Sequence, residues 1–136
     1  MGEIEPVRPS ETLSLLVIED ADDVRYLVGS LLSRDPCVDV VGDAANAADG
    51  LRAAAKLQPD VVILDDGLPD RDGVGLIPDL LRVAPHARII VLTGSHRPAR
   101  NDAIVASGAH AYISKRDALT RLMTVVGSLH SSPALH

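Results

Sequence analysis

The most informative stretch of this sequence is a run of aliphatic residues that continues directly into acidic ones. It spans residues 61–73 and reads VVILDDGLPDRDG. Its loop carries four aspartates: Asp65, Asp66, Asp70 and Asp72. Carboxylate oxygens are the ligands that hard divalent cations prefer, so a strand that ends in this much negative charge indicates a bound cation. The question is which of the four aspartates takes part in chemistry.

Other strand-like runs end in polar residues that suit the same chemistry. Glu19 and Asp20 close the run LSLLVIED, Thr93 follows RIIVL, and Lys115 follows AYIS. In an open parallel sheet, ligands bind beyond the carboxyl ends of the strands. With the strand order 2-1-3-4-5, the first and third strands are neighbours, which brings Glu19 and Asp20 beside Asp65.

Carboxylates that gather in this way repel each other. Two of them about 4 Å apart repel by about 4 kcal/mol at an effective dielectric constant near 20. A protonated acid, a buried lysine or a bound divalent cation could offset this repulsion, and an all-oxygen cluster with open positions suits Mg²⁺. Lys115 and Thr93 would then offer an ammonium and a hydroxyl to a phosphoryl group, and an aspartate can hold that group as an acyl phosphate.

Alternating strand and helix patterns supply the scaffold for these residues. Short aliphatic runs predict five strands, at residues 13–19, 38–42, 60–64, 88–92 and 111–114. The first helix is predicted to bury one stripe, made of Val24, Leu27, Val28, Leu31 and Leu32. Four more helices are predicted at residues 46–57, 73–83, 98–107 and 117–129. Five strand–helix units predict an α/β fold with a parallel sheet and right-handed crossovers.

Two local features qualify this pattern. Pro78 lies within the third predicted helix, and because proline is tolerated only near a helix start, we expect that helix to begin late. Pro and Ser punctuate both ends of the chain. We therefore expect a flexible tail at residues 1–11, one domain at 12–130, and a C-terminal tail or the start of a linker at 131–136.

Composition excludes several classes of protein. The 136 residues suffice for one domain, and the net charge of −6 argues against direct binding to nucleic acid. No apolar run approaches the roughly 18 residues of a membrane span, the first residues lack a signal-peptide core, and the single cysteine allows no internal disulfide. We expect a soluble, cytoplasmic protein that has no membrane partner.

Taken together, these motifs resemble the receiver domain of bacterial two-component response regulators over about residues 13–129. VIED matches the acidic pair, VLTGS the hydroxyl and AYISK the lysine of that family. LDDGLPDRDG fits Asp-x-x-(Met/Leu)-Pro-x-x-Asp-Gly only if Asp65 is the phosphoacceptor, because Pro69 then follows it by four residues and Gly73 by eight. Asp66 does not fit. The resemblance implies a flavodoxin-like (βα)5 fold, a doubly wound five-stranded parallel sheet of order 2-1-3-4-5.

The resemblance also implies a role for each site residue. Phosphoryl transfer would depend on Asp65, Thr93 and Lys115. Mg²⁺ would be held by Asp20, Asp65, the carbonyl of Gly67 and, through a water, Glu19. Thr93 and Tyr112 would form a switch that alters the face made by the fourth helix, the fifth strand and the fifth helix. Acidic residues after strands are often only turn residues, and we expect Asp70 and Asp72 to be solvated turn residues of this kind.

Several functions follow from this reading. The favoured one is a signalling domain that takes a phosphoryl group from a sensor histidine kinase or phosphotransfer protein, and that acts on a downstream protein or forms a homodimer. It would catalyse only its own phosphorylation and dephosphorylation. The alternatives are the N-terminal part of a DNA-binding transcription factor, since Arg116 replaces the usual proline as in receivers that precede a helix-turn-helix domain, or a small Mg²⁺-dependent phosphohydrolase. A flavin carrier is disfavoured because EDADD would repel the flavin phosphate.

Overall fold

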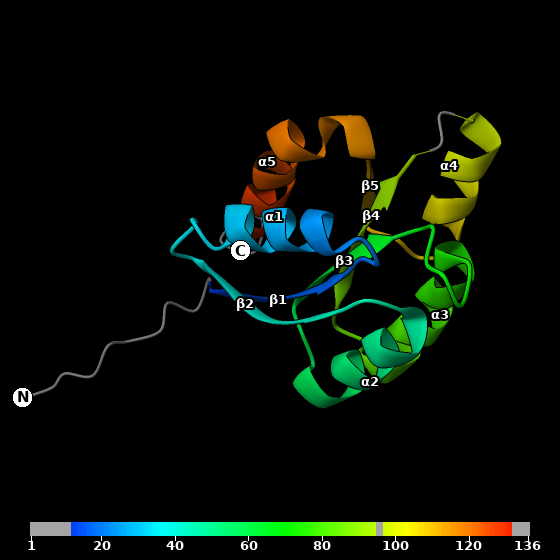
Figure 1. The fold of residues 1–136 in the computed structure, drawn as a ribbon, viewed down its shortest axis with the longest axis horizontal. Helices are drawn as coiled ribbons and strands as arrows, with labels where there is room; N and C mark the ends of the chain where they lie inside the picture. Colours follow the sequence, from blue (N-terminus) through cyan, green and yellow to red (C-terminus); the bar gives the residue numbers. More distant parts are fainter. Residues whose placement is uncertain (1–11, 95–96, 132–136) are drawn as a thin grey trace, which may run out of the picture.

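The computed structural model describes residues 12–94 and 97–131. Its strands are β1 (Leu13–Ile18), β2 (Val38–Ala44), β3 (Val61–Asp65), β4 (Arg88–Thr93) and β5 (Ala111–Ser114). Its helices are α1 (Asp22–Leu32), α2 (Ala47–Leu57), α3 (Gly73–Val83), α4 (Pro98–Ala106) and α5 (Ala118–Ser131), with a short 3₁₀ turn, η1 (Lys115–Asp117), before α5. Figure 1 shows their arrangement. The predicted tails at residues 1–11 and 131–136 lie outside the described residues, apart from Ser131, which is the last residue of α5.

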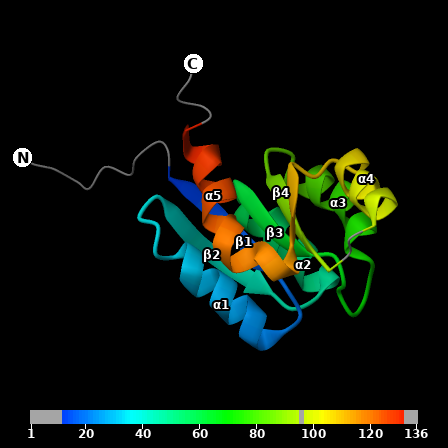
Figure 2. The same cartoon turned by 90° about the horizontal axis from the view of Figure 1, so that it is seen from above.

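The strands form one parallel sheet in the predicted order β2-β1-β3-β4-β5. The register aligns the carboxyl ends of β1, β3, β4 and β5: Ile18 pairs with Leu64, Asp65 with Leu92, and Thr93 with Ser114. Because these ends lie level, the residues that follow them meet at one edge of the sheet. Figure 2 shows the sheet between its layers of helices.

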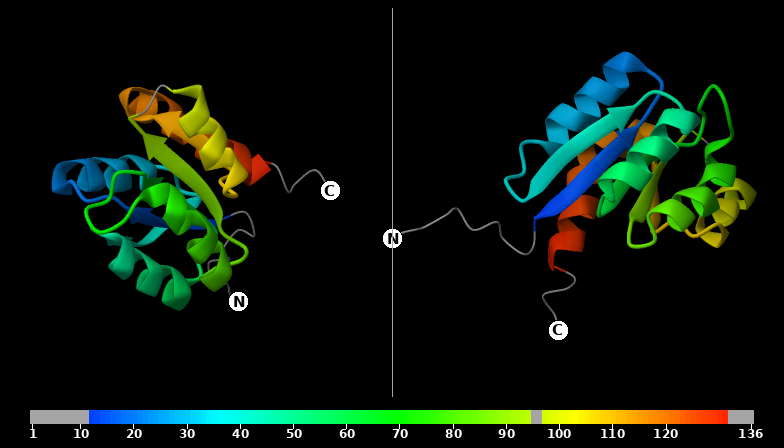
Figure 3. Two further views of the ribbon diagram at one scale, coloured as in Figure 1. Left: turned by 90° about the vertical axis from the view of Figure 1, so that its right-hand side faces the viewer. Right: turned by 90° about the horizontal axis from the view of Figure 1, so that it is seen from below.

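Side chains of alternate strand residues build two separate cores. Leu15 and Val17 pack with α1 and α5 on one face, whereas Leu16 and Ile18 pack with α2 and α3 on the other, where α4 adds Ile104. Figure 3 shows the helices on the two faces of the sheet from two further sides. Neither core contains Phe or Trp, since the chain has none, so aliphatic side chains fill both. None of the described helices has the length and apolar character needed to cross a membrane.

Helix α1 buries only part of its predicted apolar stripe. Val28 and Leu32 are buried, but Leu27 is 51% exposed, so its predicted burial was wrong. Strand β2 is the edge of the sheet, and α1 lies over β1 and β2. The outer flank of the helix therefore has no sheet beneath it. Tyr26, which precedes Leu27 in the helix, is 74% exposed.

Helix α3 does not begin late, as Pro78 led us to predict, but at Gly73 with Pro78 inside it. The cost of an interior proline is about 3 kcal/mol. Leu76, Ile77 and Leu80 are fully buried, and each such side chain contributes about 1.5–3 kcal/mol. Burial of this face therefore outweighs the proline, which lies on the exposed side.

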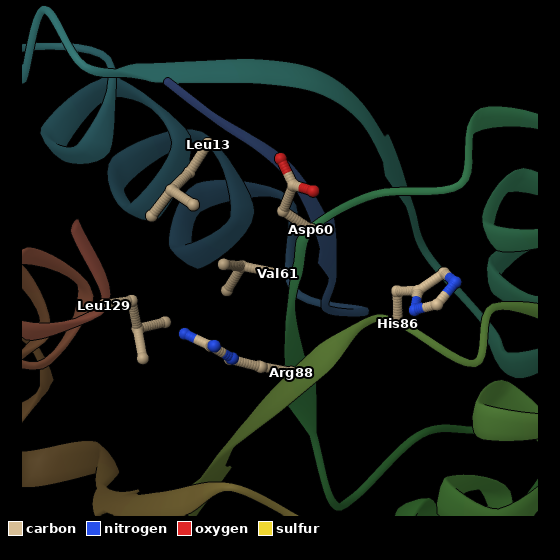
Figure 4. Close-up of a pocket in the computed structure, with 6 residues that line it drawn as sticks. All are labelled: Leu13, Asp60, Val61, His86, Arg88 and Leu129. Carbon is tan, nitrogen blue, oxygen red and sulfur yellow. The ribbon is translucent and has the colours of Figure 1, made fainter. Parts of the chain in front are cut away.

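A pocket of about 140 Å³ lies at the amino ends of the strands, opposite the acidic residues. Figure 4 shows its lining: Leu13, Asp60, Val61, His86, Arg88 and Leu129. These residues come from the amino ends of β1, β3 and β4 and from the end of α5. The pocket is thus separated from the acidic residues by the length of the strands and takes no part in their chemistry.

Candidate functional site

Three carboxylates meet where β1 and β3 end. Glu19, Asp20 and Asp65 each place an oxygen within 4.8 Å of the others. Glu19 and Asp65 are buried, at 2% and 1% exposure, and Asp20 is exposed. The neighbouring positions of β1 and β3 bring them together although 45 residues separate Asp20 from Asp65 in sequence. The cluster is therefore half enclosed, with Asp20 on its open side.

A lysine partly balances the charge of Asp65. The Nζ atom of Lys115 lies 2.7 Å from Asp65 Oδ1, and the backbone N–H of Gly67 donates to the same oxygen at 3.0 Å. Burial acts to raise the pKa of the Asp65 carboxyl, but the hydrogen bonds from Lys115 and Gly67 act against it and leave that pKa below its ordinary value. Asp65 is therefore held as an ionised carboxylate.

The other oxygens of this cluster are incompletely paired. Glu19 Oε2 accepts a hydrogen bond from the N–H of Ala21 at 3.1 Å. Glu19 Oε1 and Asp65 Oδ2 are buried and have no hydrogen-bond partner among the described residues. Burial, aided by repulsion from Asp65, raises the pKa of Glu19 to about 7. Two buried carboxylate oxygens without hydrogen-bond partners in one cluster are costly unless a cation binds them, so the cluster fits Mg²⁺.

The two residues of the predicted switch lie on adjacent strands and on one face of the sheet. Thr93 is buried at the end of β4 and pairs with Ser114, while Tyr112 pairs with Val91. Because residues two apart on a strand share a face, Thr93 and Tyr112 both lie on the face of Val91, which belongs to the core beneath α2, α3 and α4. Tyr112 is 39% exposed.

Comparison with known proteins decides the family. A model of the response regulator receiver domain matches residues 15–127. The chain belongs to this family. Receiver domains are signalling domains of two-component systems, and the fold, strand order and acidic cluster described above are those of a receiver.

Similar proteins combine the receiver with different outputs. The DNA-binding transcriptional activator DevR/DosR of Mycobacterium tuberculosis is 38% identical over 76% of this chain and 48% of its own length. A protein-glutamate methylesterase/protein-glutamine glutaminase of Agrobacterium fabrum is 38% identical over 62% of this chain and 24% of its own length. The isolated REC domain of RcsB from Salmonella enterica serovar Typhimurium matches with a TM-score of 0.81 at 26% identity, over 87% of this chain and 88% of that one. This chain spans half or less of the two longer relatives.

The remaining aspartates of the receiver's acidic loop have structural partners that the sequence did not reveal. Asp70 accepts hydrogen bonds from the N–H groups of Ala47 and Ala48 at 2.8 and 3.1 Å, so it caps the start of α2 from a distant loop. Asp72 caps α3 by accepting from Val74 N–H. Both are exposed as predicted, but neither is merely a solvated turn residue. The partners of Asp70 lie in another segment, which local spacing does not specify, whereas Asp72 caps the helix that directly follows it.

Close backbone packing requires a residue without a side chain at Gly73, the last residue of the acidic motif. A Cβ atom there would lie 2.5 Å from the Cα of Asp66 and 2.7 Å from the carbonyl oxygen of Asp65. Those backbone atoms cannot move without displacing the candidate phosphoacceptor. We expect Gly73→Ala to lower the free energy of unfolding by about 2–3 kcal/mol, as measured by chemical denaturation.

Gly75 provides the matched control for this substitution. It lies two residues further along α3, and a Cβ atom there would meet no atom within 4 Å. Gly75→Ala should therefore stabilise the receiver by about 0.5–1 kcal/mol through helix propensity. Equal stability of the two variants would contradict the packing argument.

Proposed function

We propose that this receiver accepts a phosphoryl group on Asp65 from a sensor histidine kinase or a phosphotransfer protein, in a Mg²⁺-dependent reaction. The observation that supports this most directly is the state of the Asp65 carboxylate. One of its oxygens is bound by Lys115 and Gly67, and the other is buried without a hydrogen-bond partner among the described residues, as is one oxygen of Glu19 in the same cluster. An ionised carboxylate with one uncommitted oxygen is a suitable nucleophile toward phosphorus.

The reaction forms one bond and breaks another. A carboxylate oxygen of Asp65 bonds to phosphorus while the bond from phosphorus to the donor's leaving atom breaks, and the leaving group keeps the electron pair. The negative charge of the transferring group lies on its equatorial oxygens. The ammonium of Lys115 and the hydroxyl of Thr93 would stabilise those oxygens, because Lys115 contacts Asp65 and Thr93 ends β4, the strand next to that of Asp65.

Mg²⁺ would be held by Asp20, Asp65, the carbonyl of Gly67 and, through a water, Glu19. When bound, it would neutralise charge on the phosphoryl oxygens. The protein's own contribution is to hold Glu19 and Asp65 in place by burial and backbone hydrogen bonds, while Asp20 leaves one side of the cluster open to the donor.

Two chemical tests distinguish this function from a phosphohydrolase. Incubation with a small phosphodonor such as acetyl phosphate and Mg²⁺ should add one phosphoryl group per chain, as seen by intact-protein mass spectrometry. Turnover of a phosphate ester well beyond one equivalent, without an adduct on the protein, would instead favour the phosphohydrolase.

Signalling is proposed to pass through Thr93 and Tyr112 to the face formed by α4, β5 and α5. Phosphorylation should draw the Thr93 hydroxyl toward the phosphoryl group, and Tyr112, now 39% exposed, should turn into the space that is vacated. The altered face would then bind a downstream protein or a second copy of the receiver.

Tyrosine fluorescence can measure this movement because the chain has no Trp and only two Tyr. In a Tyr26→Phe background, the emission comes from Tyr112 alone. We expect a phosphoryl analogue such as beryllium fluoride, added with Mg²⁺, to reduce quenching of Tyr112 by a dissolved quencher about twofold or more, and Thr93→Ala to abolish the reduction. Unchanged quenching, with shifts of backbone amides confined to the acidic loops, would count against the switch.

A DNA-binding output is a second proposal, favoured by the relation to DevR/DosR. That activator is about twice as long as the matched segment. In addition, Arg116 follows Lys115 here, as the family resemblance implies for receivers that precede a helix-turn-helix domain. In such a protein the receiver would control the output domain through the same α4–β5–α5 face. The gene sequence beyond His136 would test this proposal directly.

A further inference from the structure

An arginine outside the known motif joins α4 to the acidic loop. Arg100 lies in the first turn of α4 and makes two contacts with the carboxylate of Asp72, at 2.8 and 3.2 Å. The same guanidinium lies 3.5 Å from Asp66 Oδ2. The guanidinium of Arg100 therefore contacts two aspartates of the loop that follows Asp65.

Asp66 needs such a cation because it is held close to the reaction site. Its backbone N–H donates to the carbonyl of Leu92 at 3.2 Å, and its own carbonyl accepts from Gly73 N–H at 3.0 Å. Its side chain is only 11% exposed, so water screens its charge poorly. The charge of Asp66 also acts on Lys115, together with the charges of Asp65 and Glu19.

We propose that Arg100 is a positioning residue for phosphoryl transfer: it neutralises Asp66 so that the ammonium of Lys115 stays committed to Asp65 and the incoming phosphoryl group. The proposal rests on the proposed function of Asp65. Without Arg100, a second poorly solvated carboxylate would stand beside the reaction site. It would attract Lys115 away from Asp65 and repel the anionic donor.

Asp72 differs from Asp66 in its role, because it orients the guanidinium of Arg100. Its carboxylate is fixed by the N–H of Val74 at 3.2 Å and meets the guanidinium through two oxygens, which gives Arg100 a defined direction. The side chain of Asp72 is 57% exposed and well hydrated. Its charge would therefore be screened by solvent if Arg100 were removed, unlike that of Asp66.

The test compares initial rates of adduct formation from acetyl phosphate at saturating Mg²⁺. We expect Arg100→Gln to slow the reaction by about three- to tenfold, the effect of one uncompensated nearby charge. In the double variant Arg100→Gln/Asp66→Asn, the rate should return to within about twofold of Asp66→Asn alone. Arg100→Gln/Asp72→Asn should remain slow.

Arg34→Gln is the matched control. It removes an exposed arginine that follows α1, at the opposite edge of the sheet, and should react like the unmodified receiver.

Rescue by Asp66→Asn separates this role from a structural one, because loss of α4 packing would not be repaired by a change at residue 66. Arg100→Lys keeps the charge but not the planar guanidinium, so its rate of adduct formation should lie between those of Arg100→Gln and the unmodified receiver. It replaces Arg100→Gln in the test if that variant folds poorly. A normal rate in Arg100→Gln, or a slow rate that Asp66→Asn does not relieve, would overturn the proposal. If the unmodified receiver forms no adduct at all, the proposed function of Asp65 fails instead.

Discussion

Asp65→Asn is expected to abolish the phosphoryl adduct, reducing its rate of formation by about a thousandfold or more, because an amide oxygen is a far weaker nucleophile than a carboxylate. Asp66→Asn should retain the adduct with at most a modest change in rate. The structure supplies the reason for the contrast. The carboxylate of Asp65 lies with Lys115 and Glu19, whereas Asp66 Oδ2 lies beside Arg100.

Intact-protein mass spectrometry after incubation with acetyl phosphate and Mg²⁺ measures both variants directly. Both substitutions keep the size of the side chain and remove one charge, so they are matched in everything but position. An adduct that persists on Asp65→Asn and is missing from Asp66→Asn would show that the nucleophile is one residue further along. Peptide mapping of the adduct, stabilised by reduction of the acyl phosphate, would locate it independently.

Asp20→Asn is expected to weaken Mg²⁺ binding by about tenfold or more, and Glu19→Gln by less. Asp20 is the exposed member of the cluster and is proposed to bind the metal directly, whereas Glu19 is proposed to act through a water. A direct carboxylate ligand contributes more to a hard cation than an indirect one. Calorimetric titration of the unphosphorylated receiver with Mg²⁺ would give both affinities.

Removal of Mg²⁺ should have the same consequence for the reaction. Adduct formation from acetyl phosphate should stop in excess chelator and resume when Mg²⁺ is restored. Phosphorylation at an equal rate with and without chelator would contradict the metal assignment, whatever the result for Asp20→Asn. Asp39→Asn, on β2 outside the cluster, is a charge-matched control for the titrations.

The sequence by itself determined the order of the elements and the identity of the clustered acids. Strand runs and helical spacing depend on local periodicity, and the carboxyl ends of parallel strands must meet once the strand order is 2-1-3-4-5. Glu19, Asp20 and Asp65 therefore lie together as predicted, and Lys115 contacts Asp65. The local pattern was less reliable where burial competes with it, as for Leu27 of α1 and the start of α3 at Gly73.

Only the tertiary structure decided how the other charges of the acidic loop are paired. Asp70 caps α2, and Arg100 of α4 joins Asp66 to Asp72, across 22 to 34 residues of sequence. Charged side chains at loops and helix ends carry no periodic signal, and many partners are compatible with the same pattern. Which partners meet depends on how far each helix extends and how the crossovers place it over the sheet, and these follow from packing of the whole core.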